Sequence, residues 1–179
     1  MESCPLFLSG ISRYYPEHFT VARDFWLTVS LHDSIVITNS DIMLFRGRRM
    51  KRIIIDTNFY TAFKRNDPDA VFLLQRAEYI GVNTVILGEL LAGFRCGAKE
   101  KQNRIELDQF LNSARADTIT LDDETAEFYA QVFSELRQIG RPIPSNDLWL
   151  AASALQHGLA LATFDVHFRS ISGLLLAIR

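Results

Sequence analysis

The sequence predicts an α/β fold, a three-layer sandwich in which helices cover both faces of a mostly parallel central sheet. Short apolar runs rich in β-branched residues alternate with longer segments whose apolar residues recur at helical spacing, as in strand–helix–strand folds. The first such run, residues 53–55, consists of three isoleucines and is typical of a strand buried on both faces. The chain of 179 residues is long enough for one domain with a proper core.

The expected elements follow one another in this alternating order. Strands are predicted over residues 53–55, 82–85, 118–121, 159–163 and, at the sheet edge, 174–178. Helices are predicted over residues 59–64, 67–79, 101–114, 123–139 and 145–157, and a further helix contains Glu89.

Turn and cap residues support these boundaries. Asp67 followed by Pro68 is typical of a helix N-cap with proline in the first turn, and Gly81 is expected to end that helix. Ser145 is predicted to cap the last long helix, and Gly140 to end the helix before it.

Residues 1–49 differ from the rest, because they are rich in aromatic residues but have no clean helical period. Two interpretations stay open: Met50 is the natural start of translation and 1–49 is not translated natively, or 1–49 is a true appendage that binds a partner. We therefore divide the chain into an N-terminal extension, 1–49, and a domain, 50–179.

Composition excludes several classes of protein. The formal net charge of −2 provides no general attraction for nucleic acid, so such a partner would need a local patch or a metal ion. The two cysteines, Cys4 and Cys96, form no metal-binding spacing and suit a reducing compartment, and no segment resembles a signal peptide or a membrane span, so we expect a cytoplasmic protein. Motifs of phosphate-binding loops, dinucleotide sites, zinc proteases and serine hydrolases are absent.

Four acidic residues stand where parallel strands end or helices return the chain. Asp56 directly follows the isoleucine strand, Glu89 follows the second predicted strand, Asp147 opens a helix, and Asp165 follows the fourth strand. Because the carboxyl ends of parallel strands share one edge of a sheet, these carboxylates are expected to meet in one cleft. A helix-dipole role for Asp147 and a plain turn role for Asp165 are the structural alternatives.

Four carboxylates in one cleft would repel each other and raise one another's pKa, and a hard cation relieves this repulsion. Mg²⁺ and Mn²⁺ prefer carboxylate and water oxygens, so the sequence predicts a Mg²⁺ or Mn²⁺ site. A cation held in this way can activate water and offset charge on a phosphate under attack.

Neighbouring polar residues are candidates for supporting roles. Hydroxyl and amide groups that could hydrogen-bond the carboxylates belong to Thr57, Asn58, Asn146 and Thr163. His167 is a weaker candidate for a phosphate contact. A basic cluster that is either a solubilising face or a contact to a phosphate backbone consists of Arg95, Lys99, Lys101 and Arg104.

The ordered set of these motifs resembles a PIN-domain ribonuclease, and within that family the VapC-type toxins of toxin–antitoxin pairs. The resemblance is carried by Ile-Ile-Asp-Thr-Asn at 54–58, by Glu89, by Ser-Asn-Asp-Leu-Trp-Leu-Ala-Ala at 145–152, and by Leu-Ala-Thr-Phe-Asp-Val-His-Phe at 161–168. It covers residues 50–179 and has no counterpart for 1–49.

The resemblance implies Mg²⁺- or Mn²⁺-dependent cleavage of RNA, often a tRNA or rRNA, with arrest of translation. It also implies a homodimer and a small cognate antitoxin protein that blocks the cleft. The resemblance implies that all four acids are catalytic residues and that three of them, Asp56, Asp147 and Asp165, are metal ligands. It also implies that Asn58 and Thr163 are supporting residues.

Two other interpretations remain. A non-catalytic PIN-like module that binds RNA or protein would tolerate the loss of metal, although the full set of acids argues against it. A metal-dependent hydrolase of small phosphate esters would act on such esters and not on RNA.

Overall fold

The computed structural model describes residues 52–177, which alternate strands and helices. The elements are β1 (Arg52–Ile55), α3 (Thr57–Lys64), α4 (Pro68–Arg76), β2 (Tyr79–Asn83), α5 (Thr84–Cys96), α6 (Glu100–Leu111), β3 (Ala116–Ile119), α7 (Asp123–Gln138), α8 (Ser145–Gln156), β4 (Ala160–Ala162) and the 3₁₀ helix η3 (Val166–Ser170). The predicted extension, 1–49, and the start at Met50 lie outside the described residues.

The four strands form one parallel sheet in the order β3-β2-β1-β4. β1 lies inside the sheet, where Ile53 pairs with Ile80 of β2 on one side and with Ala160 of β4 on the other. The chain moves outward from β1 through β2 to β3 and then returns to the opposite side of β1 as β4. The order of strands therefore reverses between β1 and β4, which is where open α/β sheets bind ligands.

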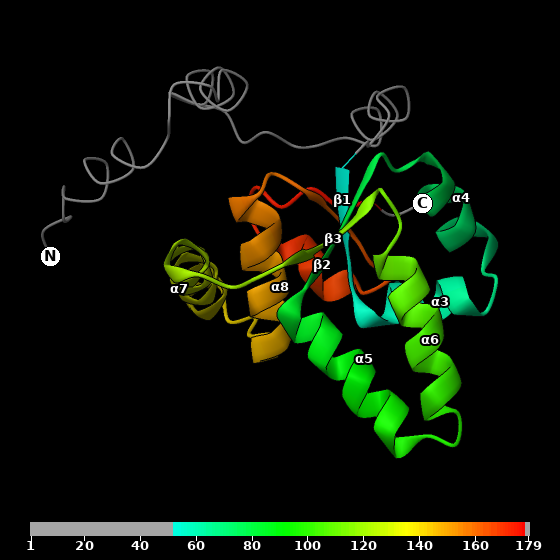
Figure 1. Ribbon diagram of the computed structural model, residues 1–179. Helices are drawn as coiled ribbons and strands as arrows, with labels where there is room; N and C mark the ends of the chain where they lie inside the picture. Colours follow the sequence, from blue (N-terminus) through cyan, green and yellow to red (C-terminus); the bar gives the residue numbers. More distant parts are fainter. Residues whose placement is uncertain (1–51, 178–179) are drawn as a thin grey trace, which may run out of the picture. The chain divides into compact units, whose positions relative to one another are not determined.

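Helices cover both faces of this sheet, which confirms the predicted three-layer sandwich. In Figure 1, α7 and α8 lie on one side of the strands, whereas α3, α4 and α6 lie on the other. All three isoleucines of β1 are fully buried, as expected for a strand covered on both faces. Among the described residues, no helix is both long and apolar enough to cross a membrane.

Several predicted boundaries are wrong, and two of them lie on either side of β2. The helix expected to reach residue 79 ends at Arg76, and Tyr79, Ile80 and Gly81 belong to β2, which pairs with both β1 and β3. Parallel pairing on two sides outweighs the local helical pattern of these residues. The strand expected over residues 82–85 therefore ends at Asn83, and Thr84 already begins α5.

Two smaller predictions also need correction. Ser145 is the first residue of α8, the N-cap is Pro144, and no side-chain hydrogen bond caps this helix. The expected fifth strand is reduced, over the described residues, to a parallel bridge between Leu161 and Leu176. Gly140 and Gly158, with φ of +67° and +59°, follow α7 and α8 as expected for helix ends.

Candidate active site

Asp56 lies at the carboxyl end of β1, only 6% exposed, and is the N-cap of α3. Its Oδ1 accepts a hydrogen bond from the Phe59 backbone N–H at 2.5 Å, and its Oδ2 accepts one from the Thr163 hydroxyl at 2.5 Å. Burial raises the pKa of Asp56, these two hydrogen bonds lower it, and the charges of Asp165 and Glu89 raise it again. This carboxylate is therefore held in one orientation beside two other acids.

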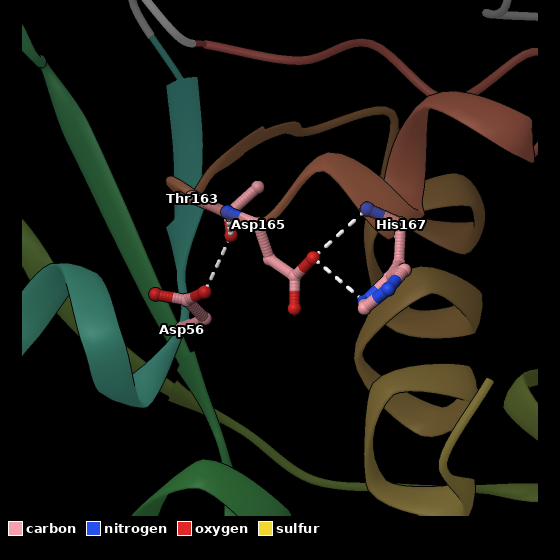
Figure 2. A network of polar contacts seen from close by, with 4 residues as sticks. All are labelled: Asp56, Thr163, Asp165 and His167. Atoms are coloured by element: carbon pink, nitrogen blue, oxygen red, sulfur yellow. Dashed lines mark hydrogen bonds and ion pairs between the residues drawn. The ribbon is translucent and has the colours of Figure 1, made fainter.

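Thr163 connects Asp56 to Asp165 across the two neighbouring strand ends (Figure 2). It is fully buried just after β4, and its Oγ1 also accepts a hydrogen bond from the Asp165 backbone N–H at 2.9 Å. One hydroxyl thus fixes the side chain of the first acid and the backbone of the second.

Asp165 is the N-cap of η3 and forms two contacts with His167 (Figure 2). Its Oδ1 accepts a hydrogen bond from the His167 backbone N–H at 2.8 Å, and the His167 Nδ1 lies 2.8 Å from the same oxygen. His167 therefore contacts a candidate acid directly, a contact that the sequence did not predict.

Glu89 lies on the second turn of α5, and each of its carboxylate oxygens accepts a hydrogen bond from a different element. The Thr57 hydroxyl of α3 donates to Oε2 at 2.6 Å, and the Asn146 amide of α8 donates to Oε1 at 2.5 Å. Of the polar neighbours singled out in the sequence, Thr57 and Asn146 therefore reach Glu89, and Thr163 reaches Asp56.

Asp147 lies in the first turn of α8 and is partly buried. Burial and the charges of Asp165, Glu89 and Asp56 raise its pKa to about 6, although His167 lowers it. All four predicted acids therefore belong to one electrostatically coupled group at the carboxyl edge of the sheet.

Asn58 and the basic cluster have weaker links to this edge. Asn58 is exposed on the first turn of α3, and within residues 52–177 its side chain makes no hydrogen bond to the four acids. In the basic cluster, Arg104 pairs with Glu100 at 2.9 Å and Arg95 lies 3.9 Å from the same carboxylate. The cluster lies around the turn between α5 and α6, at the C-terminal end of α5, whereas Glu89 lies near the N-terminal end of that helix. The roles assigned to these residues stay predictions.

The donor set fits a hard divalent cation. It consists of carboxylate oxygens whose charges oppose one another, and positive charge is the direct remedy for this repulsion. Among residues 52–177, no three acidic, histidine or cysteine side chains lie in an arrangement that could hold a metal ion as they stand. Mg²⁺ ordinarily keeps several of its waters, so it does not require a complete set of protein ligands around it.

Two further features were not predicted from the sequence. Asn83, fully buried, caps α5 through a hydrogen bond from the Ile86 N–H, and its Nδ2 donates to Ser153 of α8 at 3.3 Å. A polar residue between a strand and a helix was the available signal, but it was hidden because the strand was expected to continue past it. Phe164 stacks on Phe59, a contact between residues too far apart in sequence to be foreseen.

Comparisons with known proteins agree with this arrangement. The family model described as PIN domain matches residues 53–174. Ribonuclease VapC2 of Rickettsia felis is 30% identical over 128 residues, covering 69% of this chain and 94% of the relative. Ribonuclease VapC4 of Mycobacterium tuberculosis is 31% identical over 119 residues, covering 65% and 88%. The crystal structure of VapBC2 from R. felis bound to a promoter DNA fragment superposes with a TM-score of 0.61 at 28% identity, covering 69% of this chain and 96% of that one.

Proposed function

Because the chain belongs to the PIN-domain family, among its VapC-type toxin ribonucleases, we propose that residues 50–179 form a divalent-metal-dependent endoribonuclease that cleaves RNA phosphodiester bonds. The single observation that carries this proposal is that Asp56, Glu89, Asp147 and Asp165, which come from four separate segments of the chain, lie close enough together for their charges to raise the pKa of Asp56 and of Asp147. A fold gains no stability from assembling four like charges, so the assembly points to a ligand of opposite charge.

In this mechanism, Asp56, Asp147 and Asp165 would hold Mg²⁺ or Mn²⁺. The bound cation supplies Lewis-acid chemistry and offsets the charge that develops on the phosphate. Thr163 keeps Asp56 in place, and the backbone N–H groups of Phe59 and His167 orient Asp56 and Asp165. Each of these contacts fixes a carboxylate before substrate arrives, which lowers the cost of organising the site.

Glu89 is the carboxylate that orients the attacking water and accepts its proton. Thr57 and Asn146 each occupy one side of its carboxylate, so its remaining lone pairs have a defined direction. The water loses a proton to a carboxylate as its oxygen bonds to phosphorus, one P–O bond of the RNA breaks, and the departing oxygen takes up a proton.

The proposal includes partners. We expect a tRNA or rRNA as substrate, arrest of translation on its cleavage, a homodimer, and a small cognate antitoxin protein that blocks the cleft. The relatives named as VapC ribonucleases support an RNA substrate, and the VapBC2 structure of R. felis supports an antitoxin partner.

The test is cleavage of total tRNA and rRNA by the full chain with Mg²⁺ or Mn²⁺, with EDTA, and with Asp147→Asn. We expect cleavage that requires the metal and falls by more than about 100-fold in the variant. Asp123→Asn is the matched control, because Asp123 is an exposed acid in the first turn of α7. Cleavage that is equal in EDTA, or in Asp147→Asn, would refute the metal-dependent mechanism.

A further inference from the structure

Phe164 is a large apolar side chain placed within the candidate site. It stands between Thr163 and Asp165, and yet 46% of its surface is exposed. Its Cα atom therefore lies only about 3.8 Å from the Cα atoms of Thr163 and of Asp165. Exposed apolar side chains occur elsewhere in the described chain, and what distinguishes Phe164 is its position between two residues of the candidate site.

The Phe164 ring is fixed by its packing on Phe59. The two ring centroids are 5.7 Å apart and the rings are inclined by 21°, a stacked arrangement. Phe59 is only 2% exposed, and its backbone N–H is the group that donates to Asp56. One side of the Phe164 ring therefore lies against a core residue that also positions a candidate metal ligand, and the exposed remainder is available to a substrate.

A nucleobase is the occupant that fits this ring. Single-stranded RNA is commonly recognised by stacking of its unpaired bases on aromatic side chains. Stacking does not require positive charge on the protein, so the four neighbouring carboxylates do not prevent it. Arg95 and Arg104 of the basic cluster lie near Glu100, at the C-terminal end of α5 and away from the candidate site. They therefore cannot take the place of a stacking contact at Phe164.

We propose that Phe164 is a stacking platform for the nucleobase next to the scissile phosphate and thereby contributes to the choice of cleavage site. This inference rests on the proposed ribonuclease function. It assigns Phe164 a substrate-binding role, which is separate from the roles of the acids that perform the chemistry.

The first test measures binding of two fluorescein-labelled hexanucleotides, hexariboadenylate and its fully abasic counterpart, to the full chain with Mg²⁺. All variants carry Asp147→Asn, so that binding is measured without cleavage. Phe164→Leu is expected to weaken binding of hexariboadenylate by about tenfold and to leave binding of the abasic strand unchanged. Phe164→Trp is expected to retain binding, because a larger ring preserves stacking.

Phe133 provides a matched control. It is 44% exposed, stacks on Tyr129 at 6.4 Å, and lies on α7, where no candidate acid is located. Phe133→Leu is expected to change neither measurement. Equal melting temperatures of the Phe164→Leu and Phe133→Leu chains would show that a loss of binding does not come from unfolding.

The second test separates failure of this inference from failure of the proposed function. It compares cleavage of total tRNA by the chain with an intact Asp147 and by its Phe164→Leu variant. Absence of cleavage in both would refute the ribonuclease function and this inference with it. Cleavage at the same rate and sites in both would overturn this inference alone. Equal loss of binding to both hexanucleotides, or a weakened antitoxin complex with unchanged RNA binding, would also overturn it.

Discussion

At the residue scale, the candidate site is determined by which hydrogen-bond donors each carboxylate has. Asp56 and Glu89 each accept two hydrogen bonds, one at each oxygen, whereas the pKa of Asp147 rises to about 6 through burial and neighbouring charge. The acids with fixed donors are oriented in advance, whereas burial and neighbouring carboxylates raise the pKa of Asp147, and a nearby cation would favour its charged form. Similar side chains thus have different tasks because their surroundings differ.

Thr163→Val is the sharpest test of this orientation. Valine fills nearly the same space but removes the hydroxyl that donates to Asp56 and accepts from the Asp165 backbone. We expect RNA cleavage to fall by about 10- to 100-fold and the Mg²⁺ concentration for half-maximal activity to rise. Thr163→Ser keeps the hydroxyl and is expected to restore both. Equal cleavage by the valine and serine variants would show that the hydroxyl has no part in the site.

A second prediction at this scale concerns Tyr60, whose burial, together with the charge of Glu106, raises its pKa to about 12. Below pH 10 the side chain is protonated in both folded and unfolded chains. Between pH 10 and 12 the unfolded chain ionises first, so the free energy of unfolding falls by up to about 1.4 kcal/mol per pH unit. Tyr60→Phe removes this contribution, and urea unfolding at pH 8, 10 and 11 should show a shallower fall. Parallel curves for the two chains would contradict the argument.

At the scale of elements, two polar contacts join α5 and α8. Asn83, at the start of α5, donates to Ser153, and Glu89, two turns later, accepts from Asn146 at the start of α8. The two helices therefore run in opposite directions along their contact. The contact at Asn83 sets the position of α5, and the contact at Glu89 lies directly within the candidate site.

Asn83→Ala tests whether the distant contact supports the site. The substitution removes the cap of α5 and the hydrogen bond to Ser153, so we expect a loss of about 1–3 kcal/mol in the free energy of unfolding. We also expect reduced cleavage at temperatures where the variant is fully folded, because Glu89 shifts with its helix. Denaturant unfolding and RNA cleavage measure the two effects.

The control is Asp67→Ala, which removes the cap of α4, where Asp67 accepts hydrogen bonds from Asp69 and Ala70. It should cost comparable stability and leave cleavage unchanged. If both variants lose activity equally, stability alone accounts for the effect.

Elements with strong local signals were predicted, and those determined by distant contacts were not. The isoleucines of β1 are typical of a buried strand, so this strand was predictable. The position of Asp56 at the carboxyl end of β1 was predictable with it. No glycine or proline separates Tyr79 from the preceding helical pattern, and its pairing with Arg52 decides the outcome. The same holds for the site: the positions of the acids follow from strand ends, whereas their donors come from other elements and required the structure.

At the scale of the whole molecule, the sheet order explains why these contacts occur together. Because β4 returns beside β1, the chain brings Thr163 and Asp165 next to Asp56 across a sequence separation of more than a hundred residues. α5 and α8 then add Glu89 and Asp147 from their N-terminal turns. The site therefore forms only when the complete sheet and both helices are in place, so a cation that binds there would bind only the folded chain and stabilise it.

That linkage predicts opposite effects of one substitution with and without metal. In EDTA, Asp147→Asn removes a partly buried charge that three other carboxylates oppose, so the variant should melt at a higher temperature than the unsubstituted chain. With Mn²⁺, the unsubstituted chain should gain about 2.7 kcal/mol of stability at 100 times the dissociation constant, and the variant markedly less. Thermal melts across a Mn²⁺ series measure both effects, with Asp123→Asn as the control that should show neither. A variant that melts lower in EDTA and gains as much from Mn²⁺ would mean that Asp147 supports the fold and does not hold a cation.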